Sequence, residues 1–184
     1  MYLDTELVKF LYLALVRPHL EFAVSVWNPH LVKHINKLEK IQHRATKLPP
    51  NLRKRSYDYR LKEFGLTSLE VRRERGDLIQ FYKIINQIDH VKLINEIRCP
   101  KTDENTKIPL MNLRDKEKYF YREGTKASTV RENFLVNRII PSWNKLRPEI
   151  KNAKTLNSFK AGLDRMEKFS VKGCYSTVFT NTVA

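Results

Sequence analysis

The sequence of 184 residues contains little cysteine, little glycine and few acidic side chains. Its two cysteines, Cys99 and Cys174, lie far apart and outside any CxxC spacing. This excludes a disulfide scaffold and a zinc knuckle, and is typical of a reducing compartment. The five glycines form no GxxxxGK(S/T) or GxGxxG phosphate loop, and no GxSxG nucleophile turn is present. The common nucleotide-binding and hydrolase motifs are therefore excluded.

Long hydrophobic runs are also missing. The apolar stretch 10–16 lies between Lys9 and Arg17 and is followed by no small-residue cleavage pattern. It is much shorter than the roughly 20 residues that a membrane-spanning helix needs. We therefore expect a soluble, intracellular protein, nuclear or cytoplasmic, without membrane contact.

Paired catalytic carboxylates are absent as well. A template-directed polymerase holds two metal ions between neighbouring carboxylates, and reverse transcriptases use an adjacent Asp-Asp pair. No Asp-Asp occurs here, and the seven aspartates are dispersed along the chain. His30 and His34 have the spacing of a helical metal pair, with His43 further along, but further ligands are not evident. We predict no catalytic residue, no cofactor and no metal site, the histidines being ordinary surface or capping residues.

What the sequence has in excess is positive charge. Thirty-five Lys and Arg residues against twenty Asp and Glu give a net charge of +15 and a pI of about 9.9. The excess lies mostly in two blocks, with ten basic against two acidic residues in 31–62 and ten against four in 131–184. Such a distribution favours a polyanionic partner such as nucleic acid over a merely solvated surface.

The clearest two-faced pattern predicts a helix over about residues 30–48. One face is apolar, with Leu31, Ile35, Leu38, Ile41, Ala45 and Leu48. On the opposite face, basic residues recur at spacings of four and three: Lys33, Lys37, Lys40, Arg44 and Lys47. Only Glu39 offers an acidic neighbour, and the loop after Pro49-Pro50 adds Arg53, Lys54 and Arg55. This pattern predicts contacts to nucleic-acid phosphates, the alternative being a solvated helix face.

Two further basic residues, Arg131 and Arg138, lie seven apart on a predicted helix over 128–140. They could clamp a phosphate, or form a structural pair with Glu132 or a helix C-terminus. Trp27 and Trp143 are interpreted as core anchors rather than base-stacking platforms.

Periodicity predicts a mainly α fold. A helical bundle is expected over 1–88, an irregular linker or short β-hairpin over 89–128, a helical segment over 129–169 and a flexible tail over 170–184. A possible strand is 116–122. Ser56 and Gly65 bound a short predicted helix, and a capping box from Thr67 to Glu70 starts a longer one to about residue 88. That helix is expected to turn five residues inward, Val71, Leu78, Phe81, Tyr82 and Ile85, and four outward, Arg72, Arg73, Gln80 and Lys83.

The first predicted helix is apolar nearly all round, from Leu7 to Val16. Arg17-Pro18 marks a break, with Pro18 predicted as the first residue of a second short helix that ends near residues 27–29. Such a helix must be buried, and little else of the chain can cover it. We interpret it as a sign that an N-terminal part is missing.

Several segments resemble the region after the polymerase palm in jockey-like, LINE-type (non-LTR) retrotransposon reverse transcriptases. They lie in order over about residues 7–168 and include LYLALVRPHLEFA at 11–23, VWNP at 26–29, LEKIQHRATKL at 38–48, GLTSLE at 65–70 and LNSFK at 156–160. The sequence departs from the family at Arg114-Asp115-Lys116, where Arg-Gly-His is expected, and in the tail after Phe169. Both departures are compatible with a decayed or truncated element copy.

The resemblance implies a helical thumb and a downstream region that hold an RNA or RNA–DNA duplex without catalysis. The palm, which would hold the divalent metal ions of polymerisation, would lie upstream. Two alternatives remain: a protein-interaction module that docks on a palm domain or another protein through its apolar first helix, and an inert relic.

Overall fold

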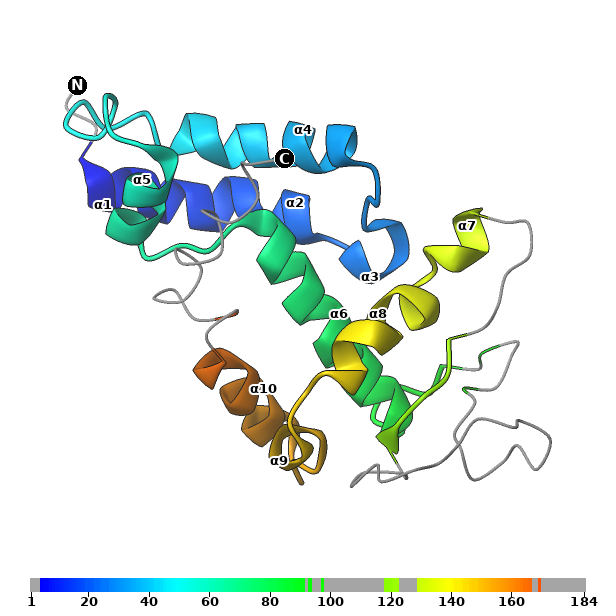
Figure 1. The fold of residues 1–184 in the computed structure, drawn as a ribbon. Helices are drawn as coiled ribbons and strands as arrows, with labels where there is room; N and C mark the ends of the chain where they lie inside the picture. Colours follow the sequence, from blue (N-terminus) through cyan, green and yellow to red (C-terminus); the bar gives the residue numbers. More distant parts are fainter. Residues whose placement is uncertain are drawn as a thin grey trace, which may run out of the picture. The chain divides into compact units, whose positions relative to one another are not determined.

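The computed structural model describes residues 4–91, 93, 97, 118–122, 129–166 and 169, and the described chain is mainly helical (Figure 1). The predicted mainly α class is therefore confirmed. The helices are α1 (Thr5–Leu11), the π-helix η1 (Tyr12–Val16), α2 (Arg17–Glu21), α3 (Val24–Trp27), α4 (Val32–Ala45), α5 (Tyr57–Phe64), α6 (Leu69–Ile85), α7 (Thr129–Glu132), α8 (Leu135–Asn144), α9 (Pro148–Lys151) and α10 (Leu156–Arg165).

The chain forms two compact units. One comprises Met1–Gly76 with Asp164–Ala184, and the other Asp77–Leu163. The division falls inside α6, whereas the predicted ranges have their first boundary after residue 88. Helix α6 contributes one end to each unit. Because its hydrophobic pattern is continuous, periodicity gives no sign of a unit boundary inside the helix.

The first helical segment buries residues that recur every four positions, with Val8, Tyr12 and Leu20 facing inward. In a regular α-helix, each residue points about 40° away from the residue four positions before it, so a series at this spacing would gradually turn away from the buried face. The wider π-turn of η1, in which the Arg17 amide donates to the Tyr12 carbonyl, offsets this drift. Pro18 lies in the first turn of α2, where no amide is needed, so the predicted start of a second short helix here is confirmed. Helix α2 ends at Glu21, earlier than predicted, and the chain turns at Ala23, which has a φ of 51°.

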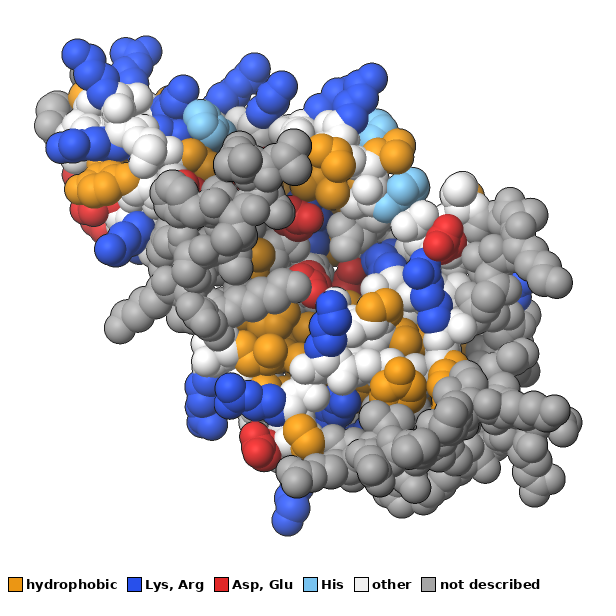
Figure 2. Space-filling view, viewed as in Figure 1, with side chains coloured by type: hydrophobic (Ala, Val, Ile, Leu, Met, Phe, Trp, Pro, Cys, Tyr) orange, Lys and Arg blue, Asp and Glu red, His pale blue; other side chains and the backbone are white. Residues whose placement is uncertain are grey.

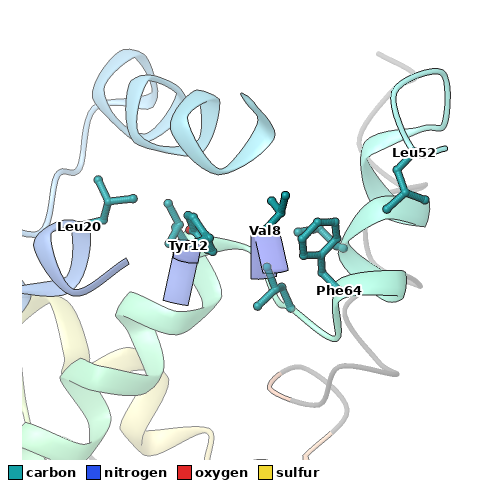
Figure 3. Packing of buried hydrophobic residues seen from close by; sticks show 8 residues of the cluster. Val8, Tyr12, Leu20, Leu52 and Phe64 are labelled. Atoms are coloured by element: carbon teal, nitrogen blue, oxygen red, sulfur yellow. The ribbon is translucent and has the colours of Figure 1, made fainter. Parts of the chain in front are cut away.

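Apolar side chains from the first segment, from α5 and from the adjoining loops form the core of the first unit (Figure 3). Figure 3 shows Val8 beside Phe64, with Tyr12 and Leu20 further along the first segment. The limits of α5 match the prediction. Ser56 Oγ accepts a hydrogen bond from the Tyr59 amide at 3.3 Å, and Gly65 ends the helix in the left-handed region with a φ of 62°.

Helix α6 buries Leu78, Phe81 and Tyr82, as predicted. Arg73 was predicted to face outward and is instead buried, with its Nε donating to Asn28 Oδ1 at 3.2 Å. A guanidinium can be buried where polar groups accept its hydrogen bonds. The acceptor here, Asn28, is 45 residues away in sequence, so the periodicity of α6 does not reveal it. The predicted capping box is also wrong. Ser68 Oγ accepts from the amide of Val71 at 3.3 Å, and no hydrogen bond joins Thr67 to Glu70, both of which are described.

An aromatic cluster forms the core of the second unit. The ring of Phe81 meets Phe120 and Trp143 edge-on at 5.3 and 5.1 Å, and Tyr82 stacks on Phe159 at 4.3 Å. Trp143 is fully buried and donates from Nε1 to the Lys118 carbonyl at 2.9 Å, so its predicted role as a core anchor is confirmed.

The predicted hairpin falls mostly outside the described residues, and the tail 170–184 lies wholly outside them. Over the described residues 118–122 no strand is formed. The amide and carbonyl of Phe120 bind the Asn144 side chain, at 3.2 and 2.9 Å. One side-chain amide thus takes the place that a partner strand would have.

Candidate nucleic-acid interface

The five predicted cations of α4 and its C-terminal turn are all exposed, and they share one face. At about 100° per residue, these positions fall within an arc of about 80° whose centre is opposite Gln42. Figure 2 shows Lys and Arg side chains gathered along the edge that α4 and the following loop form. None of the five makes an ion pair within the described part of the chain. The basic α4 face, defined as Lys33, Lys37, Lys40, Arg44 and Lys47, is therefore presented to solvent.

The inner face of α4 differs from the prediction, because its most buried residues are polar. Gln42 and Thr46 are 0% exposed. Of the predicted apolar stripe, Leu38 and Ala45 pack against the core of the first unit, as predicted, whereas Leu31 and Leu48 at its ends are 52% and 55% exposed. Gln42 accepts a hydrogen bond from Tyr12 Oη at 2.6 Å and donates to Tyr57 Oη at 3.0 Å and to the Thr67 carbonyl at 3.1 Å. Directional bonds to three segments therefore hold α4 in one rotational setting, with its cations outward.

Glu39, the acidic residue of α4, is turned inward. Its carboxylate accepts hydrogen bonds from Tyr57 Oη and, at 3.0 Å, from the Leu69 amide at the start of α6. Burial raises the pKa of Glu39, and these two hydrogen bonds oppose the rise. Because the carboxylate serves the interior, it does not neutralise the basic α4 face.

Arg60 connects the C-terminal end of α4 to the loop and to α5. Its buried guanidinium donates to Thr46 Oγ1 at 3.2 Å and to the Arg55 carbonyl, and lies 3.1 Å from His43 Nε2. Because a guanidinium only donates, His43 Nε2 must accept, which requires the neutral imidazole. Burial, followed by the charges of Arg60 and Lys47, lowers the pKa of His43 and so favours that form.

The predicted loop cations Arg53, Lys54 and Arg55 are exposed, like those of α4. The Arg55 guanidinium lies over the ring of Tyr59 at 5.3 Å from its centroid. Because Arg60 binds both Thr46 and the Arg55 carbonyl, this loop adjoins the C-terminal end of α4. The structure therefore brings together eight of the ten predicted binding residues, five on the basic α4 face and three in the loop.

Arg131 and Arg138 do not form the predicted two-turn face of one helix. Arg131 lies in α7 and Arg138 in α8, because Phe134 between them is extended, with a ψ of 149°. Arg138 forms a bidentate ion pair with the buried Asp77, with both N–O distances 2.9 Å, and donates to the Asn133 carbonyl at 3.0 Å. The structural-pair alternative thus describes Arg138, with Asp77 in place of Glu132.

Trp27 also differs from its prediction as a core anchor. It is 39% exposed, and its Nε1 donates to the Phe22 carbonyl at 2.5 Å. The indole therefore braces the turn between α2 and α3.

A pocket of about 270 Å³ lies in the first unit, and its arginines are already bound to carboxylates. Arg72 forms a bidentate pair with Glu21, one of whose N–O distances is 2.9 Å. Arg75 forms another with Asp164, at 2.7 and 2.9 Å. These pairs leave the pocket with little excess charge for an anion, which distinguishes it from the basic α4 face.

Sequence reasoning found the cations but missed the polar network that orients them. A signal was present, since Glu39, Gln42 and Thr46 recur at spacings of three and four on the face opposite the lysines. Their partners Tyr12, Tyr57 and Thr67 lie in other elements, so the hydrogen bonds could not be paired from spacing alone.

Among the described residues, no group of three His, Cys, Asp or Glu side chains could hold a metal ion. In the same part of the chain, none of the helices has the length and apolar character required to cross a membrane. No family model matches the chain, and no curated protein or solved structure is significantly similar to it.

Proposed function

We propose that the basic α4 face and the loop Arg53–Arg55 bind the phosphate backbone of an RNA or RNA–DNA duplex without catalysis. The observation that carries the proposal is the inward position of Glu39. A helix with five exposed cations and its carboxylate engaged inside presents uncompensated charge along its length. An ordinary solvated helix face would intersperse acids with these bases.

The dimensions of the face suit a duplex. Its first and last cations, Lys33 and Lys47, are 14 positions apart, or roughly 21 Å at 1.5 Å per residue, which is long enough to contact several phosphates along one groove. Each phosphate contact releases counterions, so affinity should fall steeply as salt rises. Lysine ammonium groups act as point charges and read no base edges, so binding should depend weakly on sequence.

We also propose that the chain belongs to the family that its sequence resembles. In this interpretation the chain is the thumb and downstream part of a LINE-type reverse transcriptase. A thumb that holds the template–primer duplex accounts for a basic helix on a helical unit. Its place of action would be the nucleus or the cytoplasm.

The test is fluorescence anisotropy of a labelled RNA–DNA duplex at low salt. Lys37→Glu with Lys40→Glu should weaken binding by about 100-fold or more, since it removes two phosphate contacts and adds repulsion. The matched control is Lys145→Glu with Lys154→Glu, which changes the net charge equally at exposed positions of the second unit. Equal losses in the two variants, or no binding by the wild type, would refute the proposal.

A second candidate function is docking of the first helical segment on a polymerase palm domain. The observation that favours it is an exposed apolar face on that segment, where Phe10 is 67% and Leu15 62% exposed. A soluble monomer rarely leaves such a face open unless a partner covers it. Charging Phe10 and Leu11 should abolish co-purification with a palm domain of this polymerase family, and unchanged recovery would count against docking. Lys37→Glu with Lys40→Glu should leave this docking intact.

A further inference from the structure

We propose that Tyr59, backed by Arg55, is a stacking site for an unpaired nucleobase at the end of the bound duplex. The inference rests on the proposed duplex binding and adds a ligand feature to it: a single-stranded extension next to the double-stranded part. Tyr59 is an aromatic residue outside the core cluster of the first unit.

The exposure of Tyr59 follows from the way α5 packs. The inward residues of this helix are Arg60, Leu61 and Phe64, all buried. At about 100° per residue, Tyr59 lies on the opposite side of the helix from their mean direction. It is 46% exposed, which leaves much of the ring open to solvent.

The ring is also held in place. Helix α5 is capped by Ser56 at its start and ended by Gly65, so that Tyr59 lies on a defined helix rather than on a free loop. The Arg55 guanidinium covers one face of the ring at 5.3 Å, an arrangement in which the cation and the π-system attract one another. With 46% of the residue exposed, the side chain still has surface for a ligand that can stack.

The position of the ring relative to the basic α4 face identifies that ligand. Arg60 binds Thr46 at the end of α4 at 3.2 Å, and the same guanidinium donates to the Arg55 carbonyl. The Arg55–Tyr59 pair therefore adjoins the last cations of the row. A strand that follows those cations and continues beyond its duplex would bring its first unpaired bases to this ring.

Nucleobases are the chemical class that fits such a site. Every base has a π-face, and stacking on an aromatic ring is tolerant of sequence, as a non-specific binder requires. The neighbouring Arg53 and Lys54 are exposed, and as part of the proposed duplex interface they can hold phosphates next to the junction at which the single strand begins.

The test compares two labelled probes by anisotropy: a blunt RNA–DNA duplex, and the same duplex with a four-nucleotide single-stranded extension. The wild type should bind the extended probe about tenfold more tightly, the range expected for stacking of one base. Tyr59→Ala should lose this preference and keep the affinity for the blunt duplex. Tyr59→Phe, which retains the ring, should keep both, and Phe22→Ala serves as a control at another exposed aromatic residue.

The outcomes separate the two proposals. If the wild type binds neither probe, the proposed function fails and the stacking site fails with it. If it binds both probes equally, or if Tyr59→Ala keeps the preference, the stacking site is wrong while duplex binding stands. A loss of blunt-duplex affinity in a folded Tyr59→Ala variant would also overturn it, since the ring would then serve the duplex contact itself.

Discussion

The basic side chains of α4 and of α8 lie in different electrostatic surroundings. On α4 five cations face solvent, and the carboxylate of the helix points the other way into hydrogen bonds with Tyr57 and the Leu69 amide. In α8 the guanidinium of Arg138 is mostly buried and grips both oxygens of Asp77. The comparison shows that the availability of a cation depends on where the nearest carboxylate lies in space. The number of cations in a stretch of sequence does not determine it.

The two helices are also anchored differently. Helix α4 is held from its buried side by a polar network, in which each bond has a direction. The second unit, which contains α8, is held by packed rings of Phe81, Trp143 and Phe159. A polar anchor suits a helix that has to present one particular face.

The largest effect is expected from breaking the α8 pair. Arg138→Met removes the bidentate ion pair to the buried carboxylate of Asp77 and should lower the free energy of unfolding by about 3–5 kcal/mol. Denaturant titration measures this loss, and Arg147→Met at an exposed position should change it by less than about 0.5 kcal/mol. Under folding conditions the Arg138 variant should retain duplex affinity. If the Arg138→Met protein were as stable as the wild type but bound the duplex more weakly, Arg138 would be a binding residue rather than a structural one, and the contrast between α4 and α8 would fail.

Removal of the polar anchor of α4 should have the next largest effect. Gln42→Leu has a similar size but leaves Tyr12 Oη and the Thr67 carbonyl without their partner, which should cost about 2–3 kcal/mol. The same titration measures it. If Gln42→Leu were neutral or stabilising, hydrophobic packing would be sufficient to hold the helix, and the distinction between the two anchors would not hold.

A single neutralisation on the basic α4 face should have a small and specific effect. Lys40→Gln should reduce the slope of log affinity against log salt by about one, with little change in stability, because one phosphate contact is lost. Arg138→Gln should leave that slope unchanged. Equal slopes for Lys40→Gln and the wild type would remove Lys40 from the interface.

The smallest expected effect concerns the inward carboxylate. Because burial raises the pKa of Glu39 above its ordinary value, the unfolded state ionises first as pH rises. Its stabilising contribution is therefore complete at low pH and decreases as pH rises from about 4.5 through the folded-state pKa. The stability of Glu39→Gln relative to the wild type should rise over that window in paired denaturant titrations. An opposite trend would mean that hydrogen bonds outweigh burial at this carboxylate.

Much of the fold could be predicted where one segment carries its own signal. The limits of α5 follow from Ser56 and Gly65, and the inward residues of α6 from their 3.6-residue period. Predictions that depended on a distant partner were wrong. Arg73 is buried with its Nε donating to Asn28, and Glu39 binds the Leu69 amide near the expected capping box.

The residues of the candidate site also fall into those that the local sequence predicts and those that depend on a distant partner. Its cations could be located from spacing, because charge and period are properties of the local sequence. The fate of Arg138 could not, since Asp77 lies 61 residues away. Tyr59 was not identified either, because an aromatic residue in a short helix gives no signal that it will be exposed.

The most direct test of the account is the salt dependence of duplex binding before and after neutralisation of the whole basic α4 face. Lys33, Lys37, Lys40, Arg44 and Lys47 are changed together to glutamine, which keeps helix propensity. If these five cations contact phosphates, the slope of log affinity against log salt should become shallower by about 4.5 units, at roughly 0.9 per contact. A slope that stays at its wild-type value in a folded variant would contradict the claim that this face holds the duplex.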